Sequence, residues 1–169
     1  MKRRADQISE DVRFVRNPIF RISRWFYSPE MLIPGAGTRL LRYAEKVAYS
    51  NSSSEAEDVD TEEVIIPGPA EEIRIRVYSS KESSESTPAV MHFHGGGWIA
   101  GNLNGSDDLC LEIARKTGAT VISVDYRLAP ENSFPAGFED CYAATRYVQE
   151  NPESFGVDPE RIVVTGVSA

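Results

Sequence analysis

The half of the chain after residue 88 alternates short apolar runs with longer amphipathic stretches. Apolar runs at 89–93, 120–124 and 161–165 predict three strands, and helices are predicted to begin after Ser106 and at Pro135. A run without alternating polar positions is typical of a strand in a parallel sheet that is covered on both faces. Strands that alternate with helices in this way predict right-handed βαβ crossovers and an α/β fold.

Each of these predicted helices has one apolar face and recognisable ends. Ser106 is the expected N-cap of the first helix, Gly118 lies just past its end, and Pro135 is the expected first residue of the second. The residues expected to line the apolar faces are Leu109, Cys110, Ile113 and Ala114, then Phe138, Cys141, Thr145 and Val148. Both cysteines lie on these faces, where a buried and inert thiol is expected. Asp158-Pro159 is expected to turn the chain into the last strand.

Residues 1–49 are predicted to form an N-terminal helical segment. Ile8, Val12 and Val15 recur at helical spacing, and a second helix is expected from about 38 to 49. The segment is basic and carries several aromatic residues. A helix lying on a membrane surface is therefore an alternative, although such a stripe more often packs on its own protein.

A serine-rich, acidic stretch at 50–58 is typical of a flexible linker and marks a domain boundary. The core domain is then expected to cover residues 59–169. It opens with two predicted strands, at 63–66 and 73–78, and Pro67-Gly68-Pro69 supplies the turn between them.

Composition excludes several classes of function. The chain of 169 residues has a net charge of −8, which argues against nucleic acid as a general partner. No stretch approaches the ~20 apolar residues that a membrane span needs. Asp6, Glu10 and Asp11 fall where a signal peptide would need an apolar run, and two cysteines make no disulfide framework. The expected location is therefore the cytoplasm.

A glycine-rich motif, His94-Gly-Gly-Gly-Trp98, directly follows the predicted strand at 89–93. Successive glycines let the backbone approach a ligand closely, and their N–H groups can converge on one oxygen atom. The pattern is typical of an oxyanion loop, which stabilises the negative charge of an acyl-transfer intermediate. The alternative is an ordinary flexible glycine turn.

The last apolar run ends in Gly166-Val-Ser-Ala169, which matches the first four positions of the G-x-S-x-G nucleophile elbow. That motif places a serine on a sharp turn between a strand and a helix. Alone, these four residues fit a surface turn equally well. After a glycine loop and a βαβ pattern, the catalytic interpretation is favoured.

Five motifs, taken in order, resemble those of a known family. They are His94–Trp98, Asp125–Glu131, Phe134–Ala136 with Glu139-Asp140, Asp158–Ile162 and Gly166–Ala169. From about residue 88 onward the chain resembles the hormone-sensitive-lipase-like esterase branch of the α/β-hydrolases (α/β-hydrolase fold-3). The resemblance implies a mostly parallel sheet with flanking helices, preceded by a helical cap in residues 1–49. It also implies a serine esterase, lipase-like, that hydrolyses a small carboxylic ester; no metal and no cofactor is expected.

The resemblance further implies roles for individual residues. Ser168 would be the nucleophile, and the N–H groups of Gly96, Gly97 and Ala169 would form the oxyanion hole. The residues with expected supporting roles are His94, Gly95, Trp98, Asp125, Tyr126 and Arg127.

Some of these residues also have simpler interpretations. Tyr126 and Arg127 fit a buried polar corner that braces the glycine loop better than they fit substrate contact. Asp140 fits a helix residue that is paired nearby. Trp98 could wall an acyl pocket or belong to the core.

Two departures from the family pattern matter. Val167 stands where the family usually has Asp beside the serine, which spares the nucleophile itself. The triad order in this family is Ser, then Asp or Glu, then His. Both partners are therefore expected after residue 169, and the two histidines of the chain are His92 and His94. His92 lies on the strand that feeds the glycine loop and is a poor substitute base.

Residues 59–169 are accordingly interpreted as an incomplete α/β-hydrolase core that is inactive alone. Its expected partner is a complementing C-terminal fragment or a second copy in a homo-oligomer. The alternative function is that of a receptor-like homologue that binds a small ligand without catalysis. The strand at 161–165 is expected to lie beside the strand at 89–93, with an open apolar edge on its other side.

Overall fold

The computed structural model describes residues 36–48, 56–82 and 86–168. The chain divides into two compact units, Met1–Leu40 and Leu41–Ala169. Helix α3 (Ala36–Ala48) confirms the helix predicted near 38–49. The helical spacing of Ile8, Val12 and Val15 and most of the predicted linker lie outside the described residues.

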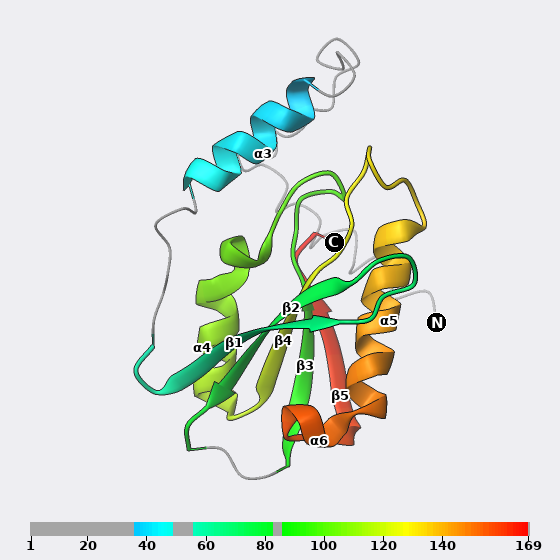
Figure 1. Cartoon of the computed structure of the whole chain (residues 1–169). Coiled ribbons are helices and arrows are strands. Elements are labelled where there is room, and N and C mark those ends of the chain that lie inside the picture. Colours follow the sequence, from blue (N-terminus) through cyan, green and yellow to red (C-terminus); the bar gives the residue numbers. More distant parts are fainter. Residues whose placement is uncertain (1–35, 49–55, 83–85, 169) are drawn as a thin grey trace, which may run out of the picture. The chain divides into compact units, whose positions relative to one another are not determined.

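Leu41–Ala169 contains one five-stranded sheet in the order β1-β2-β4-β3-β5 (Figure 1). Its strands are β1 (Val59–Ile66), β2 (Ile73–Ser80), β3 (Thr87–Phe93), β4 (Thr120–Asp125) and β5 (Val157–Gly166). The strands β3, β4 and β5 are parallel, as predicted, whereas β1 pairs antiparallel with β2 and β2 pairs antiparallel with β4. The sheet is therefore mixed, with its parallel part carrying the glycine loop and the serine.

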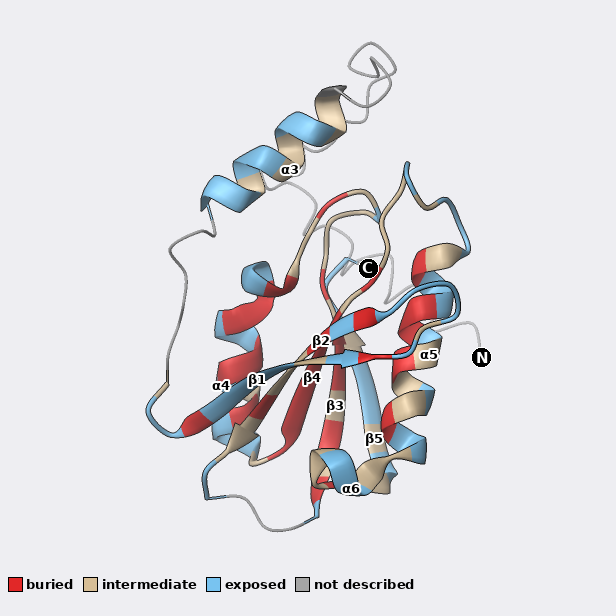
Figure 2. Ribbon diagram, viewed as in Figure 1, coloured by how far each residue is buried: buried red, intermediate tan, exposed pale blue. Residues whose placement is uncertain are grey.

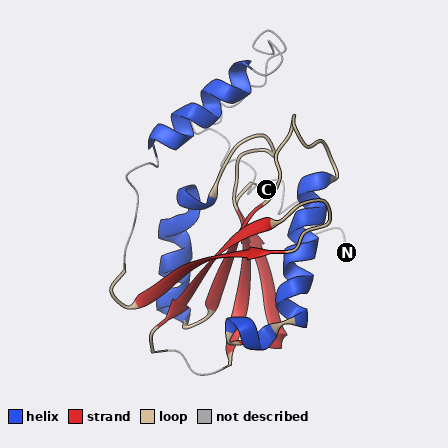
Figure 3. Ribbon diagram, viewed as in Figure 1, coloured by secondary structure: helices blue, strands red, loops and turns tan. Residues whose placement is uncertain are grey.

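Helices cover both faces of the sheet (Figure 3). Alternate residues of β4 point to opposite faces, so Val121 packs with α4 (Asp107–Thr117) and Ile122 packs with α5 (Ala136–Glu150). The strands β3 and β4 are the most deeply buried part of the sheet (Figure 2). This burial on both faces explains why their sequences read as unbroken apolar runs.

Polar contacts fix the first turn of α4 against the sheet. The carboxylate of Asp107 accepts hydrogen bonds from the Arg76 guanidinium at 2.6 Å and from the Tyr78 hydroxyl at 2.5 Å. Both donors lie on β2. The short 3-10 helix η3 (Leu103–Ser106) leads into α4. The contacts of Asp107 therefore also fix the point at which the chain enters α4 after the glycine-rich segment.

The buried faces of the helices differ from prediction in detail. In α4, Leu111 is buried and Leu109 is 39% exposed, because residues two apart point away from each other on a helix. In α5, Phe138 is 57% exposed, and the buried face contains Asp140 instead. Arg127 pairs with that carboxylate, and Cys141 and Val148 of the predicted face are buried as expected.

Two predicted boundaries, one of a helix and one of a strand, also shift. Pro135 is the N-cap of α5 rather than its first residue. Asp158-Pro159 lies inside β5, next to an irregularity in the pairing with β3, and the turn before the strand is made instead by α6 (Pro152–Phe155) and Gly156. Gly156 has a φ of 61°, a left-handed conformation that ends a helix readily.

Strand β5 lies beside β3, as predicted, and is an edge strand within the described residues. Val163 and Val164 point to opposite faces and are 57% and 63% exposed. The expected open apolar edge is therefore present in the described part of the chain. None of the helices found there combines the length and the apolar character that crossing a bilayer requires.

Candidate active site

The glycine loop, residues 94–101, leaves the end of β3, and Tyr126 holds its first residue, His94, in place. The Tyr126 hydroxyl donates a hydrogen bond to the His94 carbonyl oxygen at 2.6 Å, and the two rings stack with centroids 4.2 Å apart. Farther along the loop, the Ala129 N–H donates to the Trp98 carbonyl oxygen at 2.8 Å. The predicted polar corner is confirmed for Tyr126, which braces the loop and is 2% exposed.

The loop lies directly against the end of β5. A β-carbon built on Gly95 would lie 2.2 Å from the Val167 carbonyl oxygen and 3.9 Å from the Ser168 β-carbon. Any side chain at position 95 would therefore push the two segments apart. The next residue, Gly96, has a φ of 135°, which residues with a β-carbon rarely adopt. The structure thus brings the two predicted motifs together, although they are more than sixty residues apart in the sequence.

Ser168 lies two residues past the end of β5 and has a left-handed conformation with a φ of 57°. A non-glycine residue with positive φ is uncommon, and such strain is concentrated at functional sites. The sharp strand-to-helix turn of the elbow motif stays a prediction, and the left-handed conformation of Ser168 is compatible with it. Ala169, the third predicted oxyanion donor, lies outside the described residues.

A cavity of about 500 Å³ opens beside Ser168; we call it the serine cavity. Its wall includes Trp98, Phe138, Tyr142 and Val164. Trp98 is 42% exposed, so it is not a core residue in the described part of the chain, and its ring lies 5.6 Å from that of Tyr126. Tyr142 was not predicted as a wall residue. The spacing of Phe138 and Tyr142, four apart on one helix, was the available signal.

Arg127 and Asp125 make contacts away from the glycine loop. Arg127 donates to Asp140 from its backbone N–H at 2.9 Å, from Nε at 2.8 Å and from Nη2 at 2.7 Å. The hydrogen bond to Asp140 raises the pKa of the Arg127 guanidinium. Asp125 pairs with Arg74 of β2 at 2.8 Å. Asp125 is the last residue of β4, and Arg127 lies two residues beyond it. Arg127 ties that end of the strand to α5 rather than to the loop, and Asp140 is paired as expected.

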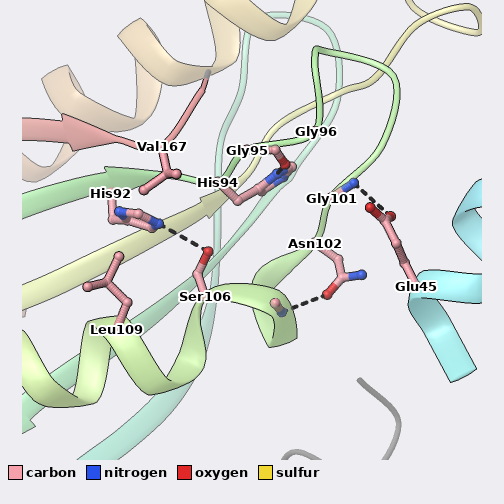
Figure 4. Close-up of a pocket in the computed structure, with 11 residues that line it drawn as sticks. Glu45, His92, His94, Gly95, Gly96, Gly101, Asn102, Ser106, Leu109 and Val167 are labelled. Carbon is pink, nitrogen blue, oxygen red and sulfur yellow. Dashed lines mark hydrogen bonds between the residues drawn. The ribbon is translucent and has the colours of Figure 1, made fainter. Parts of the chain in front are cut away.

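A second cavity, of about 380 Å³, lies between the loop, β5 and the start of α4; we call it the histidine cavity (Figure 4). It is lined by His92, His94, Gly95, Ser106 and Val167 among others. Burial lowers the pKa of His92 and of His94, so both imidazoles are neutral near pH 7.

The protonated nitrogen of His94 follows from its hydrogen bond. His94 Nδ1 lies 3.0 Å from the Gly95 carbonyl oxygen, and because a carbonyl oxygen only accepts, Nδ1 carries the proton. The basic nitrogen is then Nε2, which is buried without a hydrogen-bond partner in the described part of the chain. His94 is thus fixed in one tautomer as a part of the loop.

The two cysteine thiols are not reactive at neutral pH, and no metal-binding cluster is found among the described residues. Cys110 and Cys141 are buried, as predicted, and burial raises the pKa of each thiol to about 12. Both thiols therefore stay protonated at neutral pH. Among the described residues, no three His, Cys, Asp or Glu side chains are grouped in a way that could hold a metal ion.

The sequence is similar to those of known α/β-hydrolases and esterases. A family model described as the alpha/beta hydrolase fold matches residues 90–169. The chain is 46% identical over 98 residues to carboxylesterase NlhH of Mycobacterium tuberculosis, covering 58% of this chain and 31% of that protein. It is 44% identical over 110 residues to esterase LipI of the same species, covering 63% of this chain and 34% of that protein.

Solved structures agree with the sequence comparison. An esterase of Pyrobaculum calidifontis superposes with a TM-score of 0.69 at 37% identity, covering 76% of this chain and 43% of that one. The chain spans about a third of the length of the two curated relatives above.

Proposed function

Because the chain belongs to the α/β-hydrolase fold family and its relatives are carboxylesterases, we propose that it carries the oxyanion loop and the nucleophile of a serine carboxylesterase. One observation supports this above all. Gly95 lies against Val167 and Ser168, with Ser168 held at a φ of 57°. A surface glycine turn would need neither the close approach nor the strained serine.

In this proposal Ser168 attacks the carbonyl carbon of a small ester. Negative charge then develops on the carbonyl oxygen, and the N–H groups of Gly96, Gly97 and Ala169 donate to it. The alcohol leaves, an acyl-enzyme forms on Ser168, and water hydrolyses it. Trp98 walls the space beside the serine. His94 and Tyr126 keep the loop in place and take no proton from the serine.

The proposal assigns the proton acceptor to sequence outside residues 1–169. His94 is not placed to accept the proton of Ser168. Its Nδ1 bonds to the Gly95 carbonyl oxygen, and its basic nitrogen, Nε2, is buried without a partner in the described part of the chain. His92 is 1% exposed and bonds to Ser106. Without a base, the serine hydroxyl is a weak nucleophile. We therefore expect residues 1–169 alone to hydrolyse no ester, and a downstream Asp and His to complete the triad. The cytoplasmic location also stays a prediction.

The partner in this proposal is a polypeptide that covers β5. The exposed valines of β5 and the apolar serine cavity support such a contact. The C-terminal part of an esterase relative fits this place best, and a second copy of the chain is the alternative occupant.

The test is complementation. The 169-residue chain, alone and co-purified with the C-terminal half of the Pyrobaculum calidifontis esterase, would be assayed on a short-chain nitrophenyl ester beside Ser168→Ala. We expect no turnover from the chain alone and Ser168-dependent turnover from the complex. Turnover of the chain alone that is lost in Ser168→Ala would overturn the assignment of the base. A complex that binds the ester without Ser168-dependent turnover would favour the receptor-like alternative.

A further inference from the structure

His92 and Ser106 are joined by a buried hydrogen bond that none of the proposed catalytic roles uses. Nε2 of His92 lies 3.0 Å from Oγ of Ser106, and the two residues are 1% and 7% exposed (Figure 4). His92 is the next-to-last residue of β3, just before the glycine loop, and Ser106 is the residue at which the chain enters α4. The bond therefore closes the segment 93–105 into a ring.

Ser106 occupies the N-cap position of α4, as predicted, but does not cap the helix. Its side chain makes no hydrogen bond to the N–H groups of the first turn. An N-cap serine ordinarily makes that bond, and helices are stabilised by it. Here the hydroxyl is turned to His92 instead. The hydroxyl thus serves the contact with β3 rather than the helix that follows it.

The segment that this bond closes needs restraint. Gly96, Gly97, Trp98 and Gly101 all have positive φ, and for Trp98, at 65°, that conformation is strained. Tyr126 restrains the entry of the segment through the His94 carbonyl, and the Ala129 N–H restrains Trp98. The exit has Ser106, which His92 holds.

His92 also reaches the other half of the site. It lines the histidine cavity together with Gly95 of the loop and Val167, the residue before the serine (Figure 4). One imidazole therefore adjoins the loop, the elbow and the start of α4. Its Nδ1 is buried with no hydrogen-bond partner among the described residues. The hydrogen bond of Nε2 to Ser106 is therefore the one that orients the imidazole ring.

We propose that the His92–Ser106 pair is a clamp that closes the glycine loop at its base, and that His92 is a positioning residue for the oxyanion hole. The inference rests on the function proposed above for what the loop does, but the clamp itself is a property of the loop alone. Ser106→Ala removes the bond while leaving the imidazole in place.

The test reads the loop without catalysis. Trp25→Phe leaves Trp98 as the single tryptophan of the full chain. In this background, Ser106→Ala and His92→Gln are compared with the parent by acrylamide quenching of Trp98 and by amide hydrogen exchange of residues 93–101. We expect loop exchange to rise about two- to tenfold, as for the loss of one net hydrogen bond. Ser106→Thr keeps a hydroxyl and should restore the parent rate.

The matched control is Thr117→Ala, at the other end of α4. Thr117 also bonds through its hydroxyl, to the Ile113 carbonyl oxygen at 2.7 Å. Its loss should leave loop exchange and Trp98 quenching unchanged. Equal loop exchange in Ser106→Ala and Thr117→Ala would overturn the clamp. So would a rise confined to the first turn of α4, because that is the signature of an ordinary N-cap.

Activity of the complemented enzyme separates the two proposals. With the clamp and the esterase both correct, Ser106→Ala lowers kcat and leaves KM unchanged, since a loosened oxyanion hole binds the transition state less well. A loop response in a complex without Ser168-dependent turnover supports the clamp and refutes the esterase. Turnover without any loop response supports the esterase and refutes the clamp.

Discussion

The Tyr126 hydroxyl donates a 2.6 Å hydrogen bond to the carbonyl oxygen of His94 while its ring stacks on the imidazole of the same residue. One side chain just past the end of β4 therefore fixes both the backbone and the side chain of the first residue of the glycine loop. Because parallel strands end at the same edge of a sheet, the residue that follows β4 is well placed to reach the loop that follows β3.

Tyr126→Phe tests the hydroxyl without removing the ring. The His94 carbonyl would lose a buried donor, so we expect the free energy of unfolding to fall by about 1–3 kcal/mol. Urea unfolding measured by circular dichroism gives this value. Tyr43→Phe is the control, since Tyr43 is 67% exposed, and should change the free energy by less than about 0.5 kcal/mol. Similar losses in both variants would contradict the contact.

Gly95→Ala tests the close approach of the loop and the elbow. The added methyl group would meet the Val167 carbonyl oxygen at 2.2 Å, with backbone on both sides. We expect destabilisation at the upper end of the ~1–3 kcal/mol range for overpacking. Gly118→Ala is the control, since a β-carbon there meets nothing within 4 Å and the cost is a φ of 67°, worth about 1–2 kcal/mol. A smaller loss for Gly95→Ala than for Gly118→Ala would refute the close approach.

The sequence alone was sufficient for the strands β3, β4 and β5 and for the motifs at their ends. Unbroken apolar runs and punctuating glycines are local signals, and the glycine loop and the serine each follow such a run. Their meeting at Gly95 and Val167 came from strand order, which the family resemblance supplied. The pattern gave no sign that β2 would pair antiparallel with β4.

Side-chain pairing explains the errors within the helices. Phe138 looked like a core residue because it continued the apolar stripe of Cys141 and Val148, which are buried. Phe138 itself is exposed, and the carboxylate of Asp140 is buried instead, paired with Arg127. Likewise, Ser106 fitted an N-cap by position, but its hydroxyl bonds to His92. Neither partner is close in sequence, so spacing alone could not find them.

Asp140→Ala tests the buried ion pair. Asp140 is 1% exposed, and its loss would leave the half-buried Arg127 guanidinium without its main partner. We expect the free energy of unfolding to fall by about 3–5 kcal/mol. Glu150→Ala breaks the exposed pair of Glu150 with Arg146 and should leave the free energy of unfolding almost unchanged, because solvent screens exposed ion pairs. Equal effects of the two substitutions on chemical unfolding would show that burial of Asp140 does not govern α5.

The two buried histidines predict a loss of stability in mild acid. Burial lowers the pKa of His92 in the folded chain, whereas an unfolded histidine has a pKa of about 6.5. Below about pH 6.5 the unfolded chain therefore binds more protons than the folded chain, so the free energy of unfolding falls as the pH drops. Unfolding measured between about pH 7 and pH 5.5 checks this.

His92→Gln is the control for the acid effect. It should reduce the dependence between about pH 7 and pH 5.5 and leave the share of His94, whose pKa burial also lowers, while carboxyl groups respond at lower pH. Glu63 and Asp158, for example, have pKa values held below 4.5 and 3.8 by hydrogen bonds from Arg76 and from the Glu160 N–H, respectively. An unchanged slope in His92→Gln would assign the acid loss to other groups.

The exposed edge of β5 predicts self-association of the chain when it is purified alone. Val163 and Val164 offer apolar side chains on both faces of a strand that pairs on one side, with β3, in the described residues. An apolar edge of this kind pairs readily with other chains. We expect sedimentation velocity to detect oligomers, and thermal unfolding to occur below the ~45–65 °C that is ordinary for mesophilic domains. A monomer with a cooperative transition in that range would refute this prediction.

Val164→Lys identifies the edge responsible. Because Val164 is 63% exposed, a lysine there costs little stability, yet a charge on an edge strand opposes pairing with another chain. We expect this variant to sediment largely as a monomer. Ile65→Lys is the matched control, because Ile65 is 55% exposed on β1, the strand at the other edge of the sheet. If Ile65→Lys disperses the oligomers and Val164→Lys does not, the chains associate through β1. That result would refute the assignment of β5 as the surface that a completing polypeptide would cover.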